Sequence, residues 1–174
     1  MTTKPFWLKI DESSLRQGDY LPRCFVPTFA PASEKQTDVQ DVRVDVFDLI
    51  VLTQSCDLEN RKARLVAMSP IYHLSTFEKT NPAFANKGKR NDLRRGKIEG
   101  LHLLASPTNP DDNMDALLVD FREIYSLPYP YLLQHATQLG SRWRLRSPFL
   151  EHFSQTFARF FMRVGLPSSI PEFK

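Results

Sequence analysis

A thiol and a carboxylate stand side by side at Cys56 and Asp57, in the polar stretch 53–57 that follows the apolar run 49–52. A cysteine at the end of a buried strand can act as a nucleophile if a base takes its proton and a nearby cation lowers its pKa. The candidate catalytic residues are Cys56, Asp57 and His102, and further side chains that could orient or activate them are His73, Arg61 and Arg94. The alternative is that Cys56 is a small buried hydrophobic residue and that the side chain of Asp57 caps the turn.

The most basic stretch of the chain lies between residues 87 and 97. It contains one acidic residue, Asp92, and six basic residues: Lys87, Lys89, Arg90, Arg94, Arg95 and Lys97. Clustered lysines and arginines gain affinity for phosphates by releasing counterions, so this basic segment predicts binding of RNA or DNA. The alternative is a solvated helix or loop with no specific ligand, because no aromatic residues are interleaved. Since the net charge is only +3, a nucleic-acid surface must come from such local clustering.

Other chemistries find little support in the sequence. The chain has no His-x-x-x-His pair, no Cys-x-x-Cys pair, no Gly-rich phosphate loop and no G-x-S-x-G segment, so we expect neither a metal nor a cofactor. The two cysteines, Cys24 and Cys56, argue against a disulfide framework. No apolar run approaches the roughly 20 residues that cross a bilayer, and residues 1–7 lack the apolar core of a signal peptide, so we expect a cytoplasmic protein with no membrane contact.

The elements that must position these residues begin with two apolar runs at 49–52 and 65–68. Both are rich in branched side chains, which is typical of strands covered on both faces. The polar connection 59–62 between them is short, so the strands are expected to be antiparallel neighbours. The second strand should end near Pro70, because proline cannot donate to a ladder.

A long hairpin is expected upstream of the central strands. Residues 20–27 contain two prolines, which indicates an edge strand or a bulge. The polar stretch 30–41 predicts a loop, and 43–48 alternates and leads into the central strand.

A second hairpin is expected from the runs 100–105 and 116–125. The later run alternates and predicts one strand, on which Asp120 and Arg122 share a face and could pair with each other or with the basic segment. Residues 132–140 could form one or two helical turns.

The clearest helix spans residues 147–165. Ser147 is expected to cap it, Pro148 suits its first turn, and Gly165 followed by Pro167 should end it. Its apolar stripe, which predicts a helix packed as a lid on a sheet, consists of Phe149, Leu150, Phe153, Phe157, Phe160, Phe161 and Val164.

The length of 174 residues favours a single domain. Its expected parts are a lead-in (1–17), barrel strands (18–72), an insertion with the basic segment (73–105), further barrel strands and a connection (106–146), and the helix (147–165).

The order of these elements resembles the MazF/PemK-like toxin fold. The resemblance covers roughly residues 18–72 and 116–165, from Gly18-Asp19 through DLIVL and SPIY to LLVDFREIYSLP and the closing helix. It implies a mainly β fold, an SH3-like, bent antiparallel barrel with a C-terminal helix, and it implies that a homodimer or another protein partner is possible. The segments TQSCDL and FARFFMRVGLP are also similar to a family of uncharacterised bacterial proteins.

The resemblance does not extend to the toxins' ribonuclease residues. The family uses an arginine and a threonine where this chain has Asp48 and Tyr72. An aspartate repels phosphate, and a tyrosine with a pKa of about 10 is a poor base near neutral pH. Three functions therefore stay open: a noncatalytic module that binds nucleic acid or protein, a diverged endoribonuclease-like toxin with relocated catalytic residues, and an enzyme that depends on Cys56.

Overall fold

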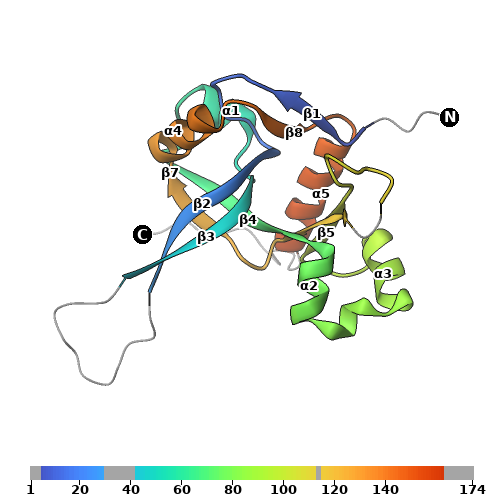
Figure 1. The fold of residues 1–174 in the computed structure, drawn as a ribbon. Helices are drawn as coiled ribbons and strands as arrows, with labels where there is room; N and C mark the ends of the chain where they lie inside the picture. The colour runs from blue at the N-terminus through green and yellow to red at the C-terminus, as the bar shows by residue number, and fades with distance from the viewer. Residues whose placement is uncertain (1–4, 30–41, 113–114, 163–174) are drawn as a thin grey trace, which may run out of the picture.

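An antiparallel sheet organises the chain (Figure 1). The computed structural model describes residues 5–29, 42–112 and 115–162. Within these ranges eight strands are hydrogen-bonded in the order β1-β8-β2-β3-β4-β6-β5, with β7 pairing with β4 beside this path. The strands are β1 (Trp7–Ile10), β2 (Asp19–Phe29), β3 (Val42–Val51), β4 (Leu65–His73), β5 (Leu101–Leu104), β6 (Leu117–Asp120), β7 (Tyr125–Pro128) and β8 (Arg142–Leu145).

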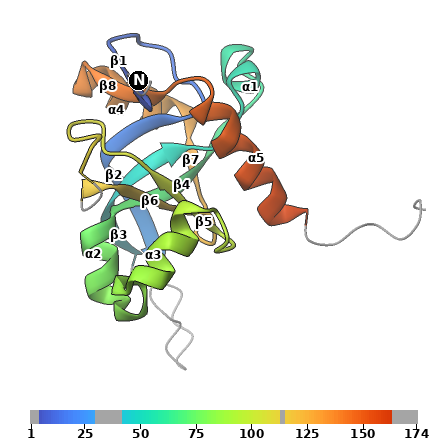
Figure 2. The same cartoon turned by 90° about the vertical axis from the view of Figure 1, so that its right-hand side faces the viewer.

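Five α-helices and one 3-10 turn accompany the sheet in the described residues. They are α1 (Ser55–Glu59), α2 (Leu74–Thr80), η1 (Pro82–Ala85), α3 (Lys87–Arg94), α4 (Tyr129–Leu139) and α5 (Phe149–Phe161). α1 and α4 lie at one end of the molecule, and α2 and α3 lie at the other (Figures 1 and 2). The chain is therefore of the mixed α/β class, with more helix than the expected mainly β fold.

The expected antiparallel pairs are confirmed for both hairpins. β2 pairs with β3 from Tyr20↔Ile50 to Phe29↔Val42, and β5 pairs with β6. The register of β2 shifts between Leu21 and Cys24, which confirms the bulge, although β2 lies between β8 and β3 and is not the outermost strand. The loop predicted at 30–41 lies outside the described residues.

β4 is the strand to which the two parts of the sheet are joined. It pairs with β3 on one side, while on the other its first half pairs with β7 and its last residues pair with β6. The Ser69 hydroxyl donates to the carbonyl oxygens of Asp120 (2.6 Å) and Glu123 (3.3 Å), where the ladder is interrupted. The prediction of one strand over 116–125 was wrong, because β6 ends in a turn at Asp120, whose carboxylate accepts from the backbone N–H of Arg122 (3.0 Å), and β7 begins only at Tyr125.

The sheet is not closed into a barrel. In the described residues no pairing connects the outer strands β1 and β5, which stand at opposite ends of the hydrogen-bonded order. The antiparallel pairing and the C-terminal helix agree with the expected fold. The expected closed barrel was wrong, because the sheet is open.

The central strands are buried on both faces, as their apolar runs predict. In β3, Leu49 and Val51 belong to a core on the side of α4, while Ile50 belongs to a core on the side of α5. This division follows from the alternation of side chains along a strand. A third, smaller core holds α2 and α3 against β5 and β6.

α5 confirms the predicted helix, with changes at its start. Pro148 takes the capping position and no side chain caps the first turn, so the prediction for Ser147 was wrong. Phe153 is fully buried, but Phe161 is 59% exposed because the last turn of the helix extends beyond the sheet (Figure 2). The predicted end of the helix, at Val164, Gly165 and Pro167, lies outside the described residues.

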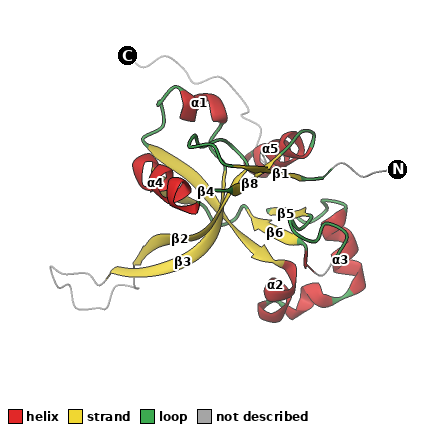
Figure 3. Cartoon of the chain, turned by 45° about the horizontal axis from the view of Figure 1, so that its top comes forward, coloured by secondary structure: helices red, strands yellow, loops and turns green. Residues whose placement is uncertain are grey.

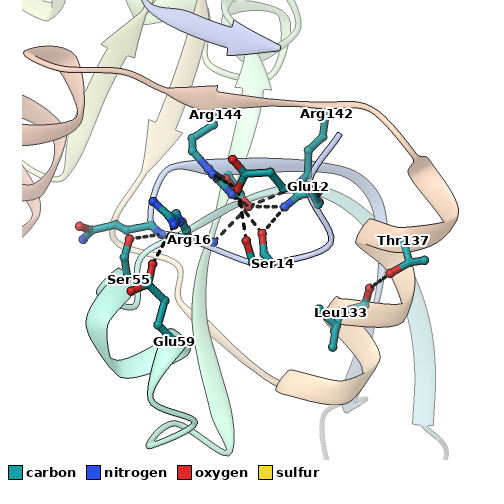
Figure 4. A network of polar contacts seen from close by, with 11 residues as sticks. Glu12, Ser14, Arg16, Ser55, Glu59, Leu133, Thr137, Arg142 and Arg144 are labelled. Carbon is teal, nitrogen blue, oxygen red and sulfur yellow. Dashed lines mark hydrogen bonds and ion pairs between the residues drawn. The ribbon is translucent and has the colours of Figure 1, made fainter. Parts of the chain in front are cut away.

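A buried ionic cluster fastens the segment before β2 to β8 (Figure 4). Asp19 is fully buried, and its Oδ2 accepts from Arg142 Nε (3.0 Å) and Arg144 Nη2 (3.0 Å), while Arg144 Nε donates to Oδ1. Arg142 also donates to the carbonyl oxygens of Glu12 (2.6 Å) and Ser14 (2.5 Å). These bonds satisfy charges that would otherwise be costly to bury, so the cluster is structural.

Candidate nucleic-acid interface

The basic segment folds as α3 and the turn that follows it. The Asn86 side chain accepts from the backbone N–H of Lys89 (2.8 Å) and so caps the helix. Leu93 is buried in the third core, and the helix ends at Arg94, followed by Arg95 as its C-cap and by Gly96 with a φ of 62°. The helix thus directs its apolar side inward and leaves most of its cations in water.

The six cations are not equivalent. Arg90 makes a two-pronged ion pair with Glu78, at 2.6 Å from Nε to Oε1 and 2.5 Å from Nη2 to Oε2. Glu78 is only 7% exposed, so this pair attaches α3 to α2. Arg90 is therefore occupied by a structural contact, while the other five cations are exposed.

Arg94 and Arg95 line a cleft between the basic segment, β5 and α5. Its volume is about 610 Å³. The lining residues are Phe6, Leu93, Arg94, Arg95, Gly96, Ile98, Glu99, Gly100, Leu101, His102, Leu103, Leu104, Phe149, His152, Thr156, Arg159 and Phe160. The structure therefore joins two of the predicted nucleic-acid-binding residues and one predicted catalytic residue in a single cavity.

The cleft is cationic because a second element contributes an arginine. Arg159 of α5 lines it together with Arg94 and Arg95, against one lining carboxylate, Glu99. Among the described residues, none of these three arginines makes an ion pair. Their guanidinium groups are thus available to an anion, and their planar geometry suits the oxygens of a phosphate.

Aromatic rings form another part of the lining. Phe6 and Phe149 stack with their ring centroids 3.7 Å apart and their planes at 13°. Phe6 precedes β1, and its carbonyl oxygen accepts from the N–H of Arg146 (3.0 Å), which holds it beside the start of α5. Aromatics that the basic segment itself lacks are therefore supplied by distant parts of the chain.

His102 lies on β5 with its ring against those of Phe121 and Phe153. The centroid distances are 6.1 Å and 5.8 Å. Burial, and to a lesser degree the nearby His152, lowers the pKa of His102 to about 4. Its imidazole is therefore neutral near pH 7 and can hydrogen-bond a ligand without adding charge.

Cys56 and Asp57 lie elsewhere, on the short helix α1. Cys56 is exposed, and its thiol approaches Gln54 Oε1 (3.7 Å) and Asp57 Oδ1 (3.9 Å). Its interpretation as a buried hydrophobic residue was wrong, because α1 turns it outward. In the part of the chain that the structure describes, no interaction joins Cys56 to His102, and the figures place α1 and β5 well apart (Figures 1 and 3). His73 does not assist Cys56 either, because its Nδ1 lies 3.4 Å from Oδ1 of Asp115.

Asp48 and Tyr72 hold structural contacts. Asp48 accepts from the Tyr20 hydroxyl (2.8 Å) and from the backbone N–H of Arg23 (2.8 Å), and so supports the bulge of β2. Burial and the nearby Glu123 raise the pKa of Tyr72, which makes it a still poorer base. The predicted pair of Asp120 and Arg122 does form, with 2.5 Å between Oδ2 and Nη2.

Of the residues that line the cleft, only Arg94, Arg95 and His102 were among the predicted site residues, and the polar or aromatic residues Phe6, His152 and Arg159 were not. A signal was present for two of them, because His152, Thr156 and Arg159 follow the spacing of one helix face. That face meets the basic segment only through tertiary packing, which a one-dimensional pattern does not contain.

Comparisons of the chain with models of protein families, with curated proteins and with solved structures find no match. Among the described residues, no group of three or more histidine, cysteine, aspartate or glutamate side chains is arranged to hold a metal ion. None of the described helices combines the length and apolar character needed to cross a membrane.

Proposed function

We propose that the protein binds single-stranded nucleic acid, RNA or single-stranded DNA, in the cleft between the basic segment and α5. The observation that carries the proposal is that Arg94, Arg95 and Arg159, from two separate elements, line one cavity. A groove with cations on two sides follows a phosphate backbone and gains affinity from the release of counterions.

The preference for single strands is argued from the aromatic lining. Unpaired bases expose their faces and stack on aromatic side chains, which stabilises binding by roughly 1–3 kcal/mol per base. Phe6, Phe149 and Phe160 line the same cavity as the arginines. A duplex keeps its bases stacked internally and would use only the cationic part of the cleft.

The second candidate function is cleavage of RNA, and it is favoured by the presence of His102 and His152 in the same cleft. With a pKa near 4, His102 is a weak base at neutral pH, so this activity would depend on His152. We further propose kinship with the MazF/PemK-like fold without its mechanism. The antiparallel strand order and the closing helix support the kinship, and the open sheet weighs against it.

Fluorescence anisotropy of labelled single-stranded RNA, single-stranded DNA and duplex DNA tests the proposal at several salt concentrations. We expect Arg94→Ala with Arg95→Ala to weaken single-strand binding at least about tenfold and to reduce the dependence on salt by about two phosphate contacts. The matched control is Lys62→Ala with Arg64→Ala, which removes two exposed cations away from the cleft.

Each outcome separates the candidates. Equal affinity of the cleft variant and the control variant would refute the cleft proposal. If the strands are shortened on a denaturing gel and a His152→Gln variant leaves them intact, RNA cleavage is supported. If cleavage persists in that variant and is lost in Cys56→Ser, the thiol enzyme is supported instead.

A further inference from the structure

One face of the β2–β3 hairpin is apolar and lies in water. Its six side chains stand in three cross-strand pairs: Phe25 with Val46, Pro27 with Val44, and Phe29 with Val42. The five phenylalanines and valines are 50 to 69% exposed. We call this surface the hairpin face.

The opposite face of the same hairpin has the reverse pattern. Near the body of the protein, Cys24 and Val26 are buried against the core that contains α4. Further out, Asp45 accepts from the Thr28 hydroxyl (2.7 Å) and pairs with Arg43 (3.6 Å). The polar side chains of the outer hairpin thus bond to one another on this face, whereas the hairpin face is entirely apolar although it too is exposed to solvent. A strand exposed to water on both faces is expected to be polar on both.

The hairpin projects from the body of the molecule (Figures 1 and 3). The exposed fractions of the hairpin face correspond to on the order of 500 Å² of apolar surface, a size at which patches on soluble proteins commonly mark interaction sites. The face carries no charged residue in its three described rows, so it does not suit a nucleic acid or an acidic peptide. A complementary partner must itself be flat and apolar.

We propose that the hairpin face binds the hairpin face of a second copy of this chain. The chain itself supplies a flat apolar partner, and a two-fold axis through the Pro27–Val44 row would superpose one face on the other. The pair would bury on the order of 1,000 Å² in total, the lower bound for a specific interface, so a weak, concentration-dependent dimer is expected. This dimer does not depend on the function of the cleft.

Analytical ultracentrifugation of the full chain over a wide concentration range tests the proposal. We expect a reversible monomer–dimer equilibrium in the wild type. Val44→Glu brings two carboxylates together at the dry centre of the interface and should weaken dimerisation at least about tenfold. The matched control is Leu65→Glu, because Leu65 is a similarly exposed (57%) apolar strand residue outside the hairpin. It should leave the equilibrium unchanged.

A crosslinking experiment tests whether the two-fold axis of the dimer passes close to Val44. In a Cys56→Ser background, which removes the exposed thiol, Val44→Cys should give a covalent dimer under mild oxidation and Leu65→Cys should not. A wild type that stays monomeric at the highest concentration reached would overturn the proposal, and so would a dimer that Val44→Glu leaves intact while the variant's circular dichroism spectrum is native.

Discussion

Arginines at two places in this protein have opposite surroundings. Arg142 and Arg144 are buried around Asp19, where carboxylate and carbonyl oxygens accept their hydrogen bonds. Arg94 and Arg95 are exposed at the rim of a cavity and, within the described residues, pair with no carboxylate. The sequence shows a pair of closely spaced arginines in both cases.

The difference teaches that the role of an arginine cannot be inferred from its charge alone. It depends on the groups that the side chain contacts in the folded protein. A buried, fully bonded arginine contributes to stability and is closed to a ligand. An exposed arginine beside a hollow contributes little to stability and is open to an anion. Stability and binding should therefore separate cleanly between the two regions.

The largest effect is expected at the buried cluster. Asp19→Asn removes the buried carboxylate that both Arg142 and Arg144 contact, while Arg144 keeps its ion pair with Glu12 (2.8 Å), and we expect it to lower the free energy of unfolding by about 3–5 kcal/mol. Asp45→Asn is the control, because it breaks a partly exposed pair with Arg43 and should cost at most about 1 kcal/mol. Urea unfolding measures both. Equal small losses would contradict the structural role of the cluster.

An intermediate effect is expected for His102 as the pH falls. Its pKa is about 4 in the folded protein and about 6.5 in an unfolded chain, so below pH 6.5 the unfolded state binds a proton that the folded state does not. Stability should thus fall with decreasing pH, by about 2 kcal/mol from about pH 7 to about pH 5. His102→Gln should remove this part of the pH dependence, and His152→Gln, at an exposed position, should retain most of it, because burial is the larger cause of the lowered pKa of His102. Urea unfolding at each pH would refute the assignment if the His102→Gln curve had the wild-type slope.

The smallest effect concerns Arg90 within the basic segment. Arg90→Ala leaves the buried Glu78 without its partner, so we expect a lower unfolding midpoint than in the wild type, by less than for Asp19→Asn because Arg90 is 36% exposed. Lys89→Ala, one residue away and exposed, should leave the midpoint unchanged. If both variants unfold at the same midpoint, Arg90 makes no stabilising contact with Glu78 and is equivalent to the five exposed cations of the basic segment.

The fold was predictable where the pattern is local. The apolar runs of β3 and β4, the two hairpins and the phenylalanine stripe of α5 follow from periodicity. The strand end predicted near Pro70 was wrong, because β4 continues to His73 and Pro70 pairs with Leu49 inside the ladder. The break between β6 and β7 was missed because the alternation continues through it. The Asp120 carboxylate holds the turn through the N–H of Arg122, and the hydroxyl of Ser69, about fifty residues earlier in the chain, donates to the carbonyl oxygen of Asp120.

The site was predictable only in part, for the same reason. The basic segment is a local feature, and two of its arginines line the cleft. The cleft also needs Phe6 and Arg159, which join the basic segment only when β1 and α5 are in place. Cys56 is conspicuous in the sequence, but its outward position on α1 separates it from the histidines expected to assist it.

The Asp19 cluster also bears on the order in which the chain can acquire its structure. Asp19 and Arg142 are 123 residues apart in sequence. While the protein is being synthesised, β2 and β3 leave the ribosome long before β8, so the carboxylate of Asp19 must stay hydrated until the arginines emerge. Early burial of this carboxylate is therefore unfavourable, and the N-terminal edge of the sheet can close only late, when a long loop is shut by contacts of high sequence separation. A nascent chain that stops short of β8 would keep that edge open to chaperones and proteases.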